Sequence, residues 1–250
     1  MNQTKRTGLL KYTRRYKEIL HCLIFEHVKN RSPCSVLDIG CRWGNDLQKV
    51  AATNADINIF GVDICSDAVK VASKELEKNQ NVHLCQARGE DLPFEDNYFD
   101  IVFSSEVIEH TEEVGKFIKE VHRVLRNQGV FIITTPSKFN YTHVIGKIVP
   151  SPFKKSLRKC VYYINPGDPD VNPHVYQYTP RELKKLFEKN GFRVGRIIGG
   201  TLRVPVWPLF ERFVFLLLIW KCLDRLIDHL PGGIHLKHNF VMEAMKLPKT

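Results

Sequence analysis

The segment from Ser35 to Asp63 limits what this chain can fold into more than any other. An apolar run, S-V-L-D-I, ends in a glycine-containing turn, and a second run, I-N-I-F-G-V, ends at Asp63. At the edge of an α/β sheet, the glycines of such a turn let the backbone approach a nucleotide, and the later acid accepts hydrogen bonds from ribose hydroxyls. The spacing Gly40-x-x-x-Gly44 lacks the third glycine of a dinucleotide fingerprint. The segment therefore predicts a nucleotide-type site that differs from a dinucleotide site.

Composition predicts a single domain with additions and an anionic partner. The chain has 250 residues, of which 43% are hydrophobic, so it can bury one sizeable core. Its formal net charge of +10 suggests nucleic acid, anionic lipid or a phosphorylated substrate, with solubility alone as the alternative. The seven cysteines contain no C-x-x-C pair. We therefore expect reduced thiols, and neither a disulfide framework nor a zinc site.

We expect neither a signal peptide at the N-terminus nor a membrane-spanning segment. The basic residues near the N-terminus are not followed by the apolar core of a signal peptide. The longest apolar run, 213–220, is roughly 8 residues, well below the ~20 that span a bilayer. We expect a cytoplasmic protein that is soluble or bound peripherally to the inner face of a membrane.

Strand-like and helix-like segments alternate along most of the chain. Apolar spacing predicts a helix over 9–28, within an N-terminal helical extension of residues 1–32. Further helices are predicted at 45–52, 67–78 and 114–125, and strands at 36–39, 57–62, 82–84, 99–103, 130–135, 192–198 and 240–244. This order is typical of a doubly wound, mainly parallel, seven-stranded α/β sheet that ends in an antiparallel pair. The domain would cover residues 33–250.

Local signals mark helix ends and an insertion. Asn127-Gln128-Gly129 is interpreted as a helix stop, and Thr179-Pro180-Arg181-Glu182 as the capped start of a helix that Asn190-Gly191 closes. Residues 136–178 are rich in proline and carry a basic cluster, which predicts an insertion or lid. Residues 204–230 form an apolar helical segment.

Five segments in order resemble the motifs of the class I S-adenosylmethionine-dependent methyltransferases. They are D-I-G-C-R-W-G at 38–44, the acid at 63, Q-A-R-G-E-D-L-P-F at 86–94, F-D-I-V-F-S-S-E at 99–106 and R-V-L-R-N-Q-G at 123–129. The resemblance covers nearly all of residues 35–246. It implies a Rossmann-like fold and S-adenosyl-L-methionine as the cofactor.

The same resemblance implies which residues bind the cofactor. Asp38 would favour its positively charged end, while Asp63 would accept hydrogen bonds from both ribose hydroxyls. The implied set is Asp38, Gly40, Gly44, Asp63, Ile64, Gly89, Glu90 and Ser104. Two departures from the family pattern are Arg42, at the usual middle glycine, and Arg88 in the adenine loop. A side chain of Arg42 that points into the site would weaken cofactor binding.

A second pattern, Glu106-Val-Ile-Glu109-His110, follows the fourth strand. On a helix its two acids and its imidazole share a face, so Glu106 and His110 are candidate catalytic residues. The pattern resembles ubiquinone-biosynthesis O-methyltransferases and metal-dependent small-RNA 2′-O-methyltransferases. The latter resemblance implies a divalent cation, Mg²⁺ or Mn²⁺, held by Glu106, Glu109, His110 and His174. The alternative is a metal-free site in which the acids cap and His110 contacts substrate.

These observations favour transfer of a methyl group from S-adenosylmethionine to a hydroxyl of an apolar or lipid-like small molecule. The net charge leaves RNA ribose 2′-O-methylation as an alternative, although no stacking platform for nucleic acid is evident. A non-catalytic protein of the same fold that binds a membrane or a partner is the third reading. The apolar segment around 207–223 is expected to pack on the sheet and wall a substrate pocket, with contact to an anionic membrane or dimerisation as alternatives.

Overall fold

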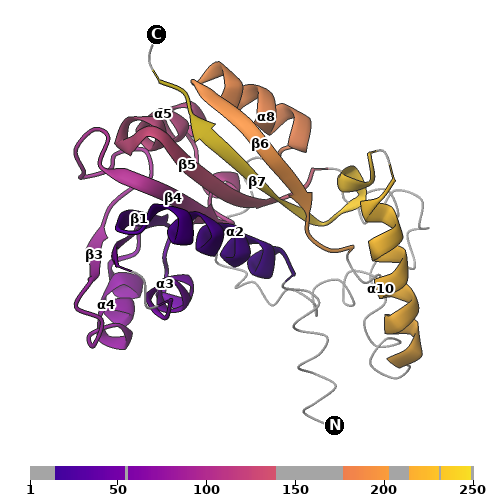
Figure 1. Cartoon of the computed structure of the whole chain (residues 1–250), viewed down its shortest axis with the longest axis horizontal. Helices are drawn as coiled ribbons and strands as arrows, with labels where there is room; N and C mark the ends of the chain where they lie inside the picture. The colour runs from indigo at the N-terminus through magenta and orange to yellow at the C-terminus, as the bar shows by residue number, and fades with distance from the viewer. Residues whose placement is uncertain (1–14, 54–55, 139–176, 203–213, 231, 249–250) are drawn as a thin grey trace.

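A seven-stranded mixed sheet forms the centre of the molecule (Figure 1). The computed structural model describes residues 15–53, 56–138, 177–202, 214–230 and 232–248. The sheet order is β3-β2-β1-β4-β5-β7-β6, and β7 is antiparallel to both of its neighbours while the other pairs are parallel. The strands are β1 Cys34–Ile39, β2 Ile57–Asp63, β3 Val82–Gln86, β4 Phe99–Ser105, β5 Leu125–Pro136, β6 Phe192–Gly199 and β7 Asn239–Lys246. The predicted doubly wound, mainly parallel sheet is confirmed.

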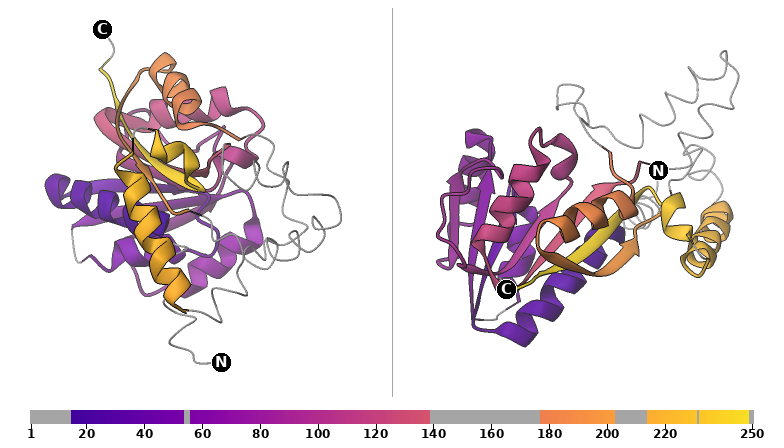
Figure 2. Two further views of the ribbon diagram at one scale, coloured as in Figure 1. Left: turned by 90° about the vertical axis from the view of Figure 1, so that its right-hand side faces the viewer. Right: turned by 90° about the horizontal axis from the view of Figure 1, so that it is seen from above.

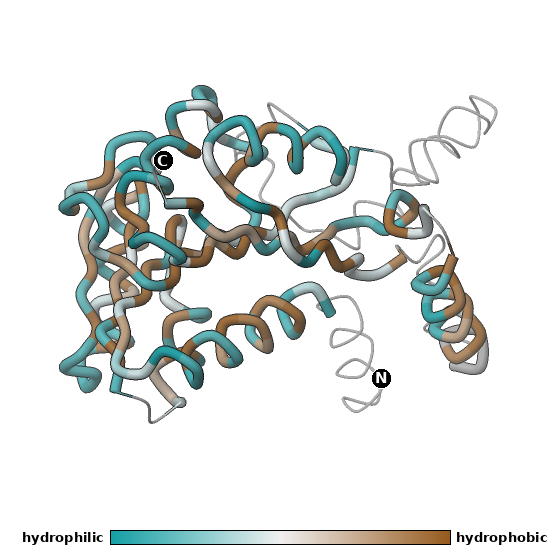
Figure 3. Tube along the Cα trace, turned by 45° about the horizontal axis from the view of Figure 1, so that its top comes forward, coloured by the Kyte–Doolittle hydropathy of each residue, from teal (hydrophilic) through white to brown (hydrophobic). Residues whose placement is uncertain are grey.

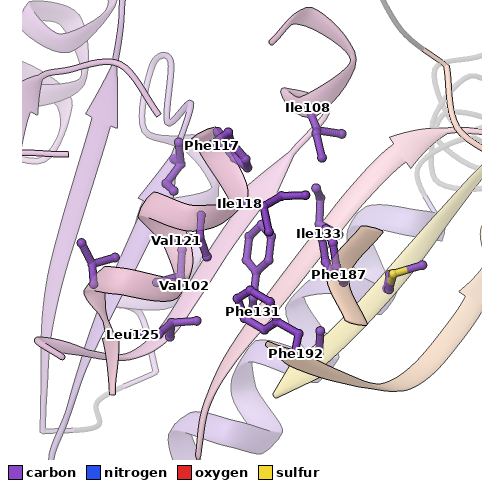
Figure 4. Packing of buried hydrophobic residues seen from close by; sticks show 14 of the residues in the cluster. Val102, Ile108, Phe117, Ile118, Val121, Leu125, Phe131, Ile133, Phe187 and Phe192 are labelled. Atoms are coloured by element: carbon purple, nitrogen blue, oxygen red, sulfur yellow. The ribbon is translucent and has the colours of Figure 1, made fainter. Parts of the chain in front are cut away.

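Helices cover both faces of this sheet (Figure 2). On one face lie α5 (Val114–Val124) and α8 (Pro180–Lys189), which pack with the strands around a cluster of phenylalanines (Figure 4). On the other face lie α2 (Arg15–Arg31), α3 (Asn45–Ala51) and α4 (Ser66–Glu75). Leu20, Leu23, Ile24 and Val28 of α2 belong to the buried cluster of this second face. The N-terminal helix therefore shares a core with the sheet.

The start of α8 has the cap that its sequence predicts. The Thr179 hydroxyl accepts a hydrogen bond from the Glu182 amide at 3.1 Å, and the Glu182 carboxylate accepts one from the Thr179 amide at 2.9 Å. Two amides that a helix start leaves without partners are thus satisfied reciprocally. The helix then ends at Lys189, just before Asn190 and Gly191, as predicted.

The predicted helix stop at Asn127-Gln128-Gly129 is wrong, because α5 ends earlier and these residues belong to β5. Phe99 pairs with Leu125, whereas Ile101 pairs with Val130, so the extra residues of β5 bulge at this point. Gln128 has a φ of 64° within the bulge. The glycine signal therefore marks a strand bulge rather than the end of a helix.

A buried ion-pair network attaches α10 (Val214–Asp228) to the end of the sheet. The fully buried Lys237 amine donates to the Asp224 carbonyl at 2.7 Å and forms an ion pair with Asp228 at 2.9 Å. The Asp224 carboxylate also accepts from the Leu202 amide at 2.8 Å, and Arg15 contacts both acids. Within the described residues, no helix is long and apolar enough to cross a membrane.

Replacing Lys237 by methionine is expected to lower the free energy of unfolding by about 3–5 kcal/mol, because Asp224 would be left buried without its ammonium partner. Urea-induced unfolding followed by circular dichroism measures the change. Lys184→Met is the matched control, since Lys184 makes an exposed i,i+4 pair with Glu188 and such pairs contribute less than about 1 kcal/mol. Equal effects of the two substitutions would refute the anchoring role of Lys237.

Candidate active site

The predicted site residues gather where β1, β2 and β4 end. These strands run parallel, so Gly40 after β1, Asp63 at the end of β2 and Glu106 after β4 reach the same edge of the sheet. Ligands of open α/β sheets bind at this carboxyl edge, beside the strand at which the order reverses. In the observed order, β1 and β4 are the adjacent central strands.

The turn after β1 depends on its glycines. Gly40 has a φ of 82°, and a Cβ added to it would lie 2.3 Å from Val107 Cγ2. The amides of Gly40 and Cys41 both donate to the Val62 carbonyl, at 2.8 and 3.0 Å, which ties the turn to the end of β2. Gly44, with a φ of 77°, is the N-cap residue just before α3. A side chain at Gly40 would have to displace Val107 in a conformation that L-residues rarely adopt.

Arg42, the first departure from the family pattern, has a left-handed backbone and a side chain that lies against Trp43. Its φ of 46° is left-handed, which explains why glycine is usual at this position. The side chain is exposed, and its guanidinium lies 4.8 Å from the centre of the Trp43 ring. This cation–π contact holds the charge over an exposed indole.

Asp63 is held by the backbone in a fixed orientation. Its Oδ2 accepts a hydrogen bond from the Arg42 amide at 2.8 Å, and its Oδ1 accepts one from the Cys65 amide at 2.9 Å. A carboxylate oxygen can accept a further hydrogen bond, so both oxygens can still serve ligand hydroxyls. Asp63 is buried, whereas the next side chain, Ile64, is 58% exposed. An anchored acid beside an exposed apolar surface suits a ribose with its attached base.

The other predicted cofactor residues lie at or near this edge but differ in surroundings. Gly89 packs against α5, and a Cβ added to it would lie 2.5 Å from the Phe117 ring. Glu90 is half-buried, with its carboxylate 3.7 Å from the exposed Arg88 guanidinium. The Ser104 hydroxyl donates to the Ile39 carbonyl at 3.0 Å. The side chain of Ser104 thus joins β4 to β1.

A group of charged residues from α2 and α3 adjoins Asp38, and sequence reasoning missed it. The Lys17 amine and His21 Nε2 both bond the Asp46 carboxylate, His21 at 2.9 Å. Burial and the Asp46 charge hold the pKa of Asp38 well above its usual range, while the Lys17 charge opposes them. The pKa of Asp46 is lowered: burial acts against this, but the bonds from His21 and Lys17 outweigh it. In the sequence, the i,i+4 spacing of Lys17 and His21 indicates that the two side chains share a helix face. It does not indicate that both bind Asp46.

Glu106 combines an unusual backbone with an unusual carboxyl group. Its φ is 59°, its amide donates to the Thr134 carbonyl at 3.0 Å, and its Oε1 accepts from the Thr134 hydroxyl at 3.3 Å. Burial raises the pKa of Glu106 to about 7, against the opposing effects of the Lys17 charge and the Thr134 hydrogen bond. A left-handed glutamate is strained, and such strain is concentrated at functional sites.

Glu106, Glu109 and His110 do not share one helix face, so this part of the prediction is wrong. A 3₁₀ helix, η1, covers only Ile108–His110, and Glu106 precedes it. Glu109 Oε2 accepts from the Thr135 hydroxyl at 3.1 Å, whereas Glu106 bonds to Thr134. Successive strand residues point to opposite faces of a sheet, so the two carboxylates are held on opposite sides.

The other residues of this second pattern differ in their surroundings. Glu109 Oε1 is buried without a hydrogen-bond partner, and burial, followed by the Glu106 charge, raises the pKa of Glu109 well above its usual range. His110 is half-buried at the end of η1, and His174 lies outside the described residues. Among the residues that the structure describes, no three His, Cys, Asp or Glu side chains are placed to hold a metal ion. The four-ligand cation site is not assembled by this part of the chain.

Sequence comparison finds a methyltransferase domain in the central part of the chain. Residues 37–133 match the family described as a methyltransferase domain. The ubiquinone biosynthesis O-methyltransferase, mitochondrial, of Rattus norvegicus is 26% identical over 179 residues, which are 68% of this chain and 48% of that protein. The ubiquinone biosynthesis O-methyltransferase of Rickettsia canadensis is 27% identical over 195 residues, 72% of this chain and 76% of that protein. The chain thus spans about half the length of the rat relative.

Structural comparison agrees at the level of fold. A SAM-dependent methyltransferase from Aquifex aeolicus superposes with a TM-score of 0.58 at 16% identity, covering 99% of this chain and 100% of that one. The sheet order and the edge around Asp63 define a class I methyltransferase fold. Residues 37–133 match a methyltransferase domain, and the chain resembles the class I S-adenosylmethionine-dependent methyltransferases, among them the ubiquinone-biosynthesis O-methyltransferases.

Proposed function

We propose that this protein transfers the methyl group of S-adenosylmethionine to a hydroxyl of an apolar small molecule, with Glu106 as the general base. The observation that carries the proposal is the partly buried Glu106 carboxyl group, whose pKa is raised to about 7 at the carboxyl edge of the sheet. A base whose pKa lies near the working pH is both deprotonated and able to accept a proton. Few surface glutamates meet both conditions.

The residues at the edge suit the chemistry of the cofactor. Asp63 would accept hydrogen bonds from the ribose hydroxyls, with the exposed Ile64 against the adenine ring. The Gly40 turn would pass the methionine part, and Asp38 would face its positively charged end. Gly44 would support the turn, while Gly89 and Glu90 would border the adenine. The hydrogen bond from the Ser104 hydroxyl to the Ile39 carbonyl would stabilise the strand ends at this edge.

The proton and the methyl group move in one balanced step. S-adenosylmethionine supplies an electrophilic methyl group on a positively charged sulfur. The substrate oxygen forms the new O–C bond as the C–S bond breaks, and Glu106 accepts the hydroxyl proton, which leaves S-adenosylhomocysteine and a neutral ether. A carboxylate within hydrogen-bond reach contributes typically about 10²-fold to 10⁴-fold to such a step. Thr134 would hold the Glu106 carboxylate in position through its hydroxyl.

An apolar hydroxylated substrate is the class that the relatives favour. The two relatives named above are called ubiquinone biosynthesis O-methyltransferases. In this proposal the Glu106 side chain, and not a bound cation, activates the substrate hydroxyl. The reason is that Glu106 and Glu109 are held on opposite sides of the sheet and do not surround one cation.

Radiolabelled methyl transfer tests the proposal directly. The protein is incubated with labelled S-adenosylmethionine and, in separate reactions, alkylated catechols and total RNA, each with magnesium or with EDTA. The proposal expects label in the catechol fraction at equal rates with magnesium and with EDTA. Label only in RNA would contradict the proposed substrate class. A rate abolished by EDTA would contradict the proposal that a protein side chain, and not a metal-bound group, accepts the proton. Calorimetric titration with S-adenosylmethionine alone separates loss of cofactor binding from loss of transfer.

Lys17 is expected to tune the base. Its charge lowers the pKa of Glu106, so Lys17→Met should move the rising limb of the pH–rate profile to higher pH. Lys49→Met is the control, because Lys49 is exposed on α3 and should leave the limb unchanged. The measurement is kcat/KM against pH for the three proteins. A limb that moves to lower pH, or equally in both variants, would remove Lys17 from the site.

A further inference from the structure

The C-terminal part of the molecule concentrates exposed apolar side chains. Among the described residues, 11 large hydrophobic side chains are exposed, and 6 of them lie between residues 218 and 236. They are Leu218, Ile219, Leu223, Leu226, Leu230 and Leu236. We call this surface the α10 apolar face. The segment around 207–223 is expected from its sequence to pack on the sheet and wall a pocket. That expectation does not hold for Leu218, Ile219 and Leu223, which are exposed, and residues 207–213 lie outside the described residues.

The α10 apolar face is directed away from the molecule. In Figure 3, α10 stands apart from the sheet and carries both apolar and polar residues. At 100° per residue, the exposed apolar residues of α10 lie within an arc of about 140°, with the buried Asp224 about opposite its middle. Asp224 is the residue that Lys237, Leu202 and Arg15 hold against the body. An ordinary surface helix buries its apolar stripe, whereas here the polar side is attached and the apolar side is presented outward.

A basic hollow continues this face. Beside Leu230, a hollow of about 340 Å³ is lined by Arg181 and Lys184 of α8 and by His235 of η2 (Gly233–Leu236). Asp228 also lines it, but its carboxylate already pairs with Lys237 and Arg15. Arg181 and Lys184 are exposed, and Lys184 shares an exposed pair with Glu188. Cationic side chains thus border one end of the apolar helix.

We infer that the α10 apolar face lies on an anionic lipid bilayer, with Arg181 and Lys184 contacting its headgroups. Three observations favour lipid: the outward apolar arc, the adjoining basic hollow and the net charge of +10. A helix at an interface places its apolar side among the acyl chains and its cations at the headgroups. The inference does not depend on the proposed function, since it concerns a different surface from the carboxyl edge.

Vesicle flotation tests the inference with the full chain. The vesicles are phosphatidylcholine alone, or an equimolar mixture of phosphatidylcholine and phosphatidylglycerol. We expect the wild type to float with the mixture and to bind neutral vesicles more weakly. Leu223→Glu with Leu226→Glu should weaken binding to the mixture by about tenfold or more. The matched control is Val71→Glu, because Val71 is similarly exposed, 46% against 42% for Leu223, but lies on α4.

Charge reversal tests the headgroup contact separately. Arg181→Glu with Lys184→Glu should weaken binding to the mixed vesicles by about tenfold or more. Lys70→Glu with Lys74→Glu changes the net charge equally but lies on α4, so it should have a much smaller effect. If the Arg181/Lys184 variant and the Lys70/Lys74 variant weaken binding equally, only the overall charge of the protein matters and the inference fails.

Two alternatives to a lipid bilayer, a second copy of the protein and another segment of the chain, would each give a different experimental result. If a second copy covers it, the wild type is a dimer by light scattering, and Leu223→Glu with Leu226→Glu gives a monomer without vesicle binding by either protein. If another segment of the chain covers it, the double variant lowers the melting temperature well beyond Val71→Glu. Either result overturns the inference, as does equal flotation of wild type and double variant.

Discussion

Replacing Glu106 by glutamine is expected to lower kcat by about 10²-fold to 10⁴-fold while S-adenosylmethionine binds with nearly unchanged affinity. Glutamine keeps the shape of the side chain and an acceptor for the Thr134 hydroxyl, but it cannot take a proton. The wild-type rate should rise with pH through about 7, because Glu106 acts only when deprotonated and burial raises its pKa to that value. The variant should lose this limb.

Steady-state methyl transfer across pH and calorimetric titration provide the two readouts. Glu112→Gln is the control, since Glu112 is exposed a few residues away and should leave both unchanged. A Glu106→Gln protein that keeps both its rate and its rising limb would show that another group accepts the proton. If the Glu106→Gln protein also loses affinity for the cofactor, the role of Glu106 is structural and not catalytic.

Asp63→Ala is expected to weaken S-adenosylmethionine binding by about tenfold or more, because buried ligand hydroxyls would lose a charged acceptor. The substitution also removes the acceptor for the Arg42 and Cys65 amides, so the turn that approaches the ligand would loosen. Isothermal titration calorimetry measures the affinity, and thermal unfolding establishes that the sheet persists.

Asp67→Ala is the matched control for Asp63. Asp67 lies in the first turn of α4, and its exposed carboxylate pairs with Lys70, so cofactor affinity should not change. Asp63→Asn should fall between wild type and alanine, because one side-chain oxygen remains to accept hydrogen bonds. Affinities that differ by less than twofold between wild type and Asp63→Ala would show that the ribose is bound elsewhere.

Much of the fold could be predicted because its signals are local. The apolar strand before Gly40, the acid after the next strand and the cap at Thr179 each act within a few residues. The same local reading failed at Asn127-Gln128-Gly129, since a glycine after polar residues can mark either the end of a helix or a bulge in a strand. Only the pairing of Phe99 with Leu125 distinguishes the two.

The candidate site was harder to predict, because its decisive contacts are long-range. The Glu106-x-x-Glu109-His110 spacing predicts a shared face only if the segment is helical from its first residue. The partners Thr134 and Thr135, from a strand formed later in the chain, instead separate the two acids. Lys17 escaped notice for a similar reason, as its acid Asp46 lies on another helix. No sequence pattern specifies which side of α10 would be held by Lys237.

The position of β7 has a consequence for how the molecule is made. β7 is the last of the described strands in chain order, yet it lies between β5 and β6. During synthesis from the N-terminus, β5 emerges with a fully apolar stretch, 130–133, and must wait for its partner while more than a hundred further residues are added. An unpaired strand edge of this kind is where nascent chains associate wrongly. The sheet is therefore completed only after β7 has been synthesised, and a nascent chain that stops before β7 exposes the unpaired edge of β5.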